Sequence, residues 1–198
     1  MFFFTLKKKL FTFIGDIKWA GITRPFWFTI NASGYKLNGT HYREVIKLLN
    51  PGDILLRRFE GYIDKWLIPG WWNHAGIYIG GESEEVVHAI SDGVKREDVL
   101  NFMRTDHMIV LRKKSTNSKY RDKVVERALS IVGKPYDFDF DFDKANRFSC
   151  TELAAYCHSD IKIDGKRRWN SLWKKVLVAD DFLACNKLKV VWDSRQSG

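Results

Sequence analysis

The stretch RFSCTEL at residues 147–153 decides how this sequence is interpreted. Ser149 is followed three residues later by Glu152 and then by an apolar run, so the pattern predicts a capping box and a helix that begins at Cys150. At this first helical position the unpaired amides and the positive end of the helix dipole favour a thiolate and offer donors to an oxyanion. Such boxes also cap ordinary helices with buried cysteines, so this pattern alone does not establish catalysis.

Two histidines upstream are placed to serve such a thiol. His74 begins an apolar segment that ends in Gly80-Gly81, and this pattern predicts a strand followed by a turn. His88 lies in the middle of residues 86–90, which are predicted to form the returning strand of a hairpin. In the right register both rings project from one face of that hairpin. The arrangement fits a nucleophile, a base and a residue that orients the base, although a lone strand histidine is more commonly structural.

The remaining pattern predicts hairpin-linked strands with helices gathered around them, which indicates an α+β fold and not a doubly wound sheet. The best-defined helix is predicted over Lys119–Val132, where Gly133 supplies the stop signal. A short helix is predicted over Glu97–Met103, and a final strand over Lys187–Asp193.

The order of these motifs resembles that of the circularly permuted NlpC/P60 cysteine hydrolases, particularly the YiiX/YebB-like group. Lecithin:retinol acyltransferase-like enzymes are more distant relatives. The similarity runs from about Pro51 to Cys157. In that family the histidine strand precedes the cysteine helix, the reverse of the usual papain-like order, and this chain has the permuted order. Four motifs carry the resemblance: GDI at 52–54, HAGIY at 74–78, GKPYD at 133–137 and CTEL at 150–153.

The resemblance implies a permuted papain-like fold in which the nucleophile-bearing helix packs against an antiparallel sheet. It implies Cys150 as the nucleophile, His74 as the general base and His88 as the third polar residue. Close YiiX-like members often have a glutamate in place of His88, so their substrates do not transfer directly. The expected reaction is hydrolysis of an amide, in a cell-wall peptide or an amino-acid conjugate, through an acyl-thioester. The alternatives are a lipid-directed acyltransferase or thioesterase at a membrane surface, and a non-catalytic binding module that retains the fold.

Three further residues are candidates for oxyanion or substrate binding. Tyr136 precedes the cysteine helix in a loop and can donate a hydrogen bond, and Thr151 follows Cys150 directly. Trp72, like its neighbour Trp71, can line a substrate pocket beside His74. Tyrosine after proline and tryptophan beside a strand are also typical packing residues, so both interpretations stay open.

The composition is that of a globular protein. Of the 198 residues, 45% are hydrophobic and 15% aromatic, which argues against disorder. The three cysteines are an odd number, and Cys150 and Cys157 lie too far apart along one predicted helix to form a disulfide. The net charge of +9 comes from scattered basic residues without a nucleic-acid-binding motif, so no nucleic-acid partner is expected.

One segment is similar to a calcium-binding loop. Residues 137–143 read DFDFDFD, with acids at the first, third and fifth positions of an EF-hand. The sixth position needs glycine and the twelfth a bidentate glutamate, whereas this chain has Phe142 and Phe148 there. No cysteine or histidine pair has zinc-finger spacing. Neither a metal nor another cofactor is therefore expected.

The first forty residues form an apolar and basic extension before the predicted enzyme domain at 41–198. Residues 1–14 lack the charge order and cleavage site of a signal peptide, and no apolar run approaches the roughly 18 residues that span a bilayer. A cytoplasmic location is expected. Leu6 to Ala20 has helical apolar spacing with interspersed lysines, which is typical of a peripheral helix on an anionic membrane and also of a core helix. The sequence leaves the oligomeric state open.

Overall fold

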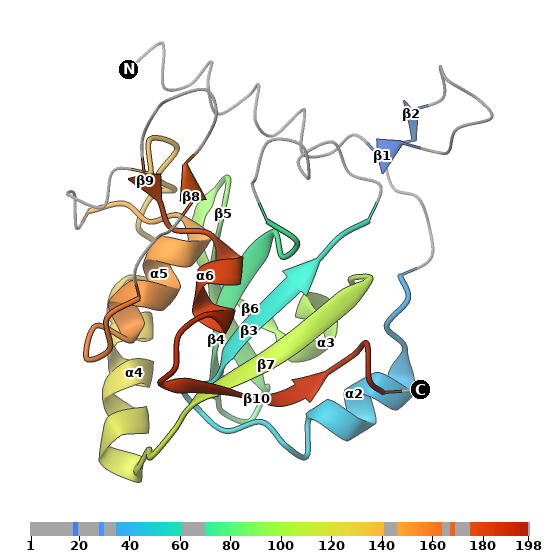
Figure 1. The fold of residues 1–198 in the computed structure, drawn as a ribbon, viewed down its shortest axis with the longest axis horizontal. Coiled ribbons are helices and arrows are strands. Elements are labelled where there is room, and N and C mark those ends of the chain that lie inside the picture. The colour runs from blue at the N-terminus through green and yellow to red at the C-terminus, as the bar shows by residue number, and fades with distance from the viewer. Residues whose placement is uncertain are drawn as a thin grey trace.

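A computed structural model describes residues 18–19, 28–29, 35–60, 70–140, 146–163, 167–168 and 175–197. Its centre is a six-stranded sheet in the order β10-β7-β3-β4-β5-β6, in which every neighbouring pair is antiparallel (Figure 1). The strands are β3 (Ile54–Arg58), β4 (His74–Gly80), β5 (Glu85–Ile90), β6 (Gly93–Asp98), β7 (His107–Lys113) and β10 (Leu188–Asp193). This sheet confirms the predicted α+β class.

Helices cover both faces of the sheet. The side chains of α4 (Ser118–Ser130), α5 (Cys150–Cys157) and α6 (Ala179–Leu183) join one hydrophobic cluster. Those of α2 (Gly39–Val45) and α3 (Val99–Phe102) join a second cluster on the opposite face. Two short strand pairs complete the described elements: β1 (Lys18–Trp19) with β2 (Phe28–Thr29), and β8 (Arg167–Arg168) with β9 (Lys175–Val176).

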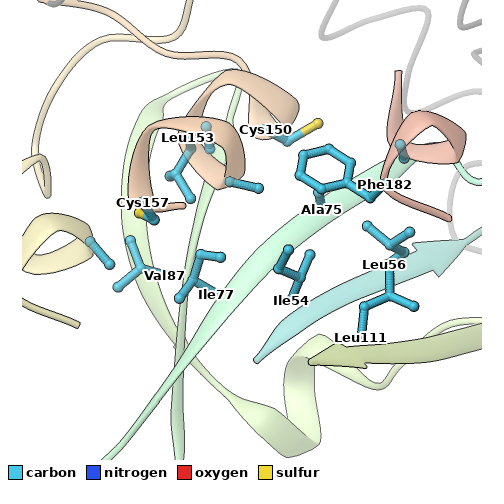
Figure 2. Close-up of a cluster of buried hydrophobic side chains, with 14 of the residues drawn as sticks. Ile54, Leu56, Ala75, Ile77, Val87, Leu111, Cys150, Leu153, Cys157 and Phe182 are labelled. Atoms are coloured by element: carbon cyan, nitrogen blue, oxygen red, sulfur yellow. The ribbon is translucent and has the colours of Figure 1, made fainter. Parts of the chain in front are cut away.

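Strand alternation produces the two clusters. Ile54 and Leu56 of β3 point to the α5 face, whereas Leu55 between them points to the α3 face. All three side chains are fully buried, since helices cover both sides of the central strands. Figure 2 shows the α5-side cluster, in which Ile54 and Leu56 lie below Ala75 and near Phe182. This alternation also decides on which face of β4 each residue of the candidate site lies.

One predicted element is wrong in part. Residues 97–98 are not helical, because they are the end of β6, which pairs with β5 along its whole length. The helix begins only at Val99, where the Asp98 side chain caps it by accepting from the Asn101 amide at 2.8 Å. The charges of this edge strand, sequence GVKRED, hide the alternation by which a strand is recognised.

The N-terminal region is described only in part. The predicted helix over Leu6–Ala20 lies outside the described residues, except that Lys18–Trp19 form β1 and are therefore extended. Residues 35–40, placed in the extension by the sequence, already contact the sheet domain: Leu37 packs on the α3-side cluster and its amide donates to Thr105. Among the described segments, no helix has both the length and the apolar character to cross a membrane.

Candidate active site

The start of α5 has the geometry that the sequence predicts. Ser149 and Glu152 form a reciprocal capping box, in which the Ser149 amide donates to the Glu152 carboxylate at 2.7 Å and the Glu152 amide donates to the Ser149 hydroxyl at 3.4 Å. Both side chains are buried. A capped and buried helix terminus holds Cys150 at the first helical position in one orientation.

The Cys150 thiol is nearly buried, with 7% of the residue exposed. Burial raises its pKa to about 11, while the backbone amides of Ala75, Thr151 and Cys150 itself interact with the sulfur and act in the opposite direction. The helix terminus therefore contributes amides, as the sequence predicts, but desolvation outweighs them. At neutral pH the resting group is a thiol surrounded by donors that can stabilise an anion.

The two histidines are in direct contact. His74 begins β4, and His88 lies in β5 directly opposite Gly76. Since residues two apart on a strand share a face, both rings project from the same side, as predicted. His74 Nε2 lies 2.9 Å from His88 Nδ1, and the ring planes are perpendicular. The Phe102 ring packs against both imidazoles at centroid distances of 5.9 and 5.4 Å.

Burial keeps both imidazoles neutral. It lowers the pKa of His88 to about 3 and that of His74 well below the usual histidine value. The positive charge of Arg57 shifts both pKa values in the same direction. Each ring therefore carries a single N–H, and its tautomer decides in which direction a proton can move.

The thiol and the imidazole both lie near the first residues of β4, on opposite faces of the sheet. The Cys150 sulfur interacts with the amide of Ala75, which is the residue after His74. Ala75 belongs to the α5-side cluster, whereas the His74 ring lies with Phe102 on the other face. Within the described segments, no hydrogen bond joins the thiol to the His74 ring, and Nδ1 of that ring has no hydrogen-bond partner. Nδ1 is thus the nitrogen of His74 that remains available to accept a proton.

The structure adds two charged residues that sequence analysis missed. Glu97 Oε2 lies 3.3 Å from His88 Nε2 and 3.6 Å from Arg57 Nη1. Arg57 is the residue of β3 directly opposite His74 in the sheet. Its guanidinium stacks 4.1 Å from the Phe102 ring centroid and donates to the Phe102 carbonyl at 2.9 Å. A charged residue at an inward position of an apolar strand was the available signal for Arg57, whereas Glu97 fell in the wrongly predicted helix.

Burial opposes the charged forms of this pair. It lowers the pKa of Arg57 to about 10, and it raises the pKa of Glu97, on which Arg57 acts in the opposite direction. Each of the two charges therefore depends on the other for its stability.

A comparison with protein families places this arrangement in context. Residues 48–192 match the model of permuted papain-like amidase enzymes of the YaeF/YiiX, C92 family. The chain belongs to this amidase family. The matched range contains the predicted cysteine helix and both histidine strands, so the resemblance drawn from the sequence motifs is confirmed.

A solved structure shows the same fold as this amidase-family chain. The crystal structure of metalloprotein yiiX from Escherichia coli O157:H7 is similar with a TM-score of 0.62 and 16% sequence identity, over 74% of this chain and 98% of that one. A search of curated proteins found no match. At this identity the structural similarity establishes the permuted papain-like fold and nothing further.

All three candidate binding residues of this amidase-family chain make packing or hydrogen-bond contacts within the protein. Trp72 is 1% exposed and belongs to the α5-side core, so its side chain packs in the interior. The Thr151 hydroxyl donates to the Leu177 carbonyl at 3.0 Å, so its backbone amide, and not its side chain, faces the thiol. Tyr136 packs against Phe138 with ring centroids 4.7 Å apart.

The acidic segment whose sequence is similar to a calcium loop forms ion pairs with the residue that precedes the start of α5 by three positions. Arg147 pairs with Asp137 and with Asp139, each at 2.9 Å, so these carboxylates hold the loop that leads into α5. In the part of the chain that the structure describes, no group of three or more histidine, cysteine, aspartate or glutamate side chains is arranged to hold a metal ion.

Proposed function

We propose that this chain is a cysteine amidase in which Cys150 is the nucleophile, His74 the general base and His88 the residue that orients His74. The observation that carries the proposal is the 2.9 Å contact between His74 and His88. His74 directly precedes Ala75, whose amide interacts with the Cys150 sulfur. Nucleophilic catalysis needs these three functions at one place, and membership of an amidase family is consistent with this reaction type.

The first half-reaction forms an acyl-thioester. The thiol gives its proton to His74 Nδ1, since Nε2 of that ring faces His88. The sulfur then attacks the amide carbonyl carbon, and the oxygen of the tetrahedral intermediate accepts hydrogen bonds from backbone amides at the start of α5. As the carbon–nitrogen bond breaks, the His74 imidazolium protonates the departing amine, which leaves the acyl group on the Cys150 sulfur.

The second half-reaction restores the enzyme. Neutral His74 takes a proton from water, and the resulting hydroxide attacks the thioester carbonyl. The carbon–sulfur bond breaks, the carboxylic acid leaves, and the thiolate recovers its proton from His74. Because Cys150 and His74 both begin the cycle uncharged, proton transfer accompanies attack and does not precede substrate binding.

The substrate class follows only from the family resemblance. We propose an amide of a peptide or an amino-acid conjugate, including cell-wall peptides. The experiment is incubation of the protein with amide and ester probes of peptides, amino-acid conjugates and lipids, followed by intact and peptide mass spectrometry. We expect an acyl adduct on Cys150 from an amide probe, and its loss in Cys150→Ala and His74→Ala. An adduct from lipid esters alone would instead support a lipid acyltransferase, and binding without any adduct would support a non-catalytic module.

A further inference from the structure

We propose that Glu97 is a positioning residue that sets the direction of proton transfer through His88 to His74, and that Arg57 keeps Glu97 in place and ionised. The inference deepens the proposed function and rests on it, because it concerns the same site. It extends the Cys150, His74 and His88 set by two residues from β6 and β3.

A continuous series of contacts links the side chains of His74, His88, Glu97 and Arg57. His74 Nε2 contacts His88 Nδ1 at 2.9 Å, and the other nitrogen of His88, Nε2, lies 3.3 Å from Glu97 Oε2. Arg57 Nη1 lies 3.6 Å from the same oxygen. Among the described residues, Glu97 Oε2 is buried and accepts no hydrogen bond of good geometry. A buried acceptor without a hydrogen bond is costly, and the donors nearest to it are the His88 ring and the guanidinium.

The carboxylate makes one set of tautomers favourable. An ionised Glu97 can only accept, so it favours a proton on His88 Nε2. His88 Nδ1 is then bare and accepts from His74 Nε2–H. His74 Nδ1 is therefore bare as well, which is the form that can receive the thiol proton. With the opposite tautomers, His74 Nδ1 would carry a hydrogen and could not act as a base. Glu97, which reaches His74 through His88, thus decides whether His74 can act as the base.

Arg57 explains why a partly buried glutamate remains an acceptor at this place. Burial raises the pKa of Glu97, and the positive charge of Arg57 lowers it. The Arg57 side chain is itself held by the Phe102 carbonyl and the Phe102 ring. The same aromatic ring packs on both imidazoles, so one hydrophobic residue supports the whole set. The charged and titratable groups that act on His88 and Glu97 are Arg57, His74, Lys95, Asp98 and Arg104.

The test is ¹⁵N NMR of the histidine rings in the full chain, which has five histidines. Spectra of His74→Ala and His88→Ala assign the two signals. In the wild type we expect both His74 and His88 to carry the hydrogen on Nε2. In Glu97→Leu we expect a mixture of tautomers in both rings. Glu97→Gln retains an amide oxygen that accepts from His88, so this variant should restore the wild-type tautomers.

Reactivity gives the second readout. The rate of Cys150 carboxamidomethylation by iodoacetamide at pH 7 should fall at least about tenfold in Glu97→Leu, because loss of the correct histidine tautomer costs about 10⁴ in a Ser-His-Asp triad and Glu97 is one contact further away. The rate in Glu97→Gln should be close to that of the wild type, because this variant keeps an oxygen that accepts from His88. The matched control is Glu85→Leu, which removes a carboxylate paired with Arg96 Nε at 2.9 Å on the same two strands without touching either histidine. This control should react like the wild type.

Three outcomes would overturn the inference: a hydrogen on Nδ1 of His88 in the wild type, unchanged tautomers in Glu97→Leu, or an equal loss of reactivity in Glu85→Leu. Thermal melts of each variant separate unfolding from loss of the tautomer preference. The tautomers of the wild-type protein test the inference even where the leucine variant does not fold. The tautomer measurement does not depend on catalysis. If the tautomers change as expected while no amide acylates Cys150, the proposed function fails and the positioning role of Glu97 stands.

Discussion

His74 Nε2 lies 2.9 Å from His88 Nδ1 because Gly76 is directly opposite His88 in the sheet and His74 is two residues before Gly76 on the same face of β4. The contact therefore depends on the register of one strand pair. A shift of one residue in that pairing would move one ring to the α5 face and separate the two. Features that fix the start and the register of β4 should accordingly affect the site as strongly as the site residues themselves.

The first prediction concerns the base. His74→Ala should lower the rate at which iodoacetamide modifies Cys150 on the order of 100-fold, since general-base assistance typically contributes 10²–10⁴. Cys185, which is partly exposed, provides an internal control whose rate should not change. Peptide mass spectrometry of time points at pH 7 measures both rates in one sample. Equal rates for Cys150 in the variant and the wild type would show that the imidazole does not serve the thiol.

The second prediction concerns the register. A Cβ added at Gly76 would lie 2.7 Å from Val86 Cγ1 and 3.0 Å from Phe102 Cε2. Gly76→Ala should therefore destabilise the protein by about 1–3 kcal/mol, the usual cost of overpacking, and move the ring that supports both histidines. Val86→Ala in the same chain removes the closest atom and should recover part of the loss. Urea unfolding of both single variants and the double variant measures the coupling, and simple additivity would contradict the predicted clash.

The positions of the candidate site residues in the fold were partly predictable from the sequence, because the main signals are local. A capping box marks Cys150, and alternation within two short segments marks His74 and His88, with no knowledge of the rest of the fold needed. Glu97 could not be found in this way. It lies on an edge strand rich in charges, next to a genuine helix start at Val99, and its relation to His88 exists only through the pairing of β5 with β6. The burial that raises the pKa of Cys150 is likewise a property of the packed clusters and not of any motif.

The third prediction concerns the start of β4. The Asp180 carboxylate accepts from the amides of Trp71 and Trp72 at 2.9–3.0 Å, and so ties α6 to the segment that leads into His74. Asp180→Ala leaves these amides without their acceptor and should cost about 1–3 kcal/mol. It should also slow Cys150 modification, because His74 would be less firmly held. Asp180→Asn retains one acceptor oxygen and should be milder in both assays, whereas identical effects of the two changes would argue against the hydrogen bonds as the cause.

The fourth prediction concerns stability in acid. Burial lowers the pKa of His88 to about 3 and that of His158 to about 4, against an ordinary value of 6.5 in the unfolded chain. Below pH 6.5 the unfolded state therefore binds protons that the folded state does not. As the pH falls below 6.5, each of these histidines should lower the free energy of unfolding by about 1.4 kcal/mol per pH unit, until the pH reaches the pKa of that histidine in the folded protein.

Urea denaturation at pH 7, 6 and 5 measures this dependence. In His158→Gln, the slope of the free energy of unfolding against pH should decrease by the contribution of about one proton. His158 suits this test because it lies outside the proposed site and its neutral partner is the Tyr120 hydroxyl at 2.9 Å. An acid dependence equal in His158→Gln and the wild type would show that His158 is not held neutral by burial.

The last prediction concerns the charge of Arg57. Its guanidinium lowers the pKa of His74 and of His88, and its interaction with Cys150 favours the thiolate over the thiol. Arg57→Met keeps an apolar stem against Phe102 but removes the charge. The two histidine pKa values should then rise towards 6.5, and the pKa of the Cys150 thiol should rise further above its already high value.

A pH series can separate the change in the thiol pKa from the change in the histidine pKa values. At pH 8 the variant should react more slowly with iodoacetamide, because less thiolate is present, and its histidine signals should titrate at higher pH than in the wild type. Arg58→Met is the matched control: Arg58 is the next residue of β3, stacks on Trp71 with its guanidinium carbon 4.6 Å from the ring centroid, and faces away from His74. If Arg58→Met shifted the His74 titration as much as Arg57→Met does, the effect would be one of general surface charge, and Arg57 would have no specific part in the site.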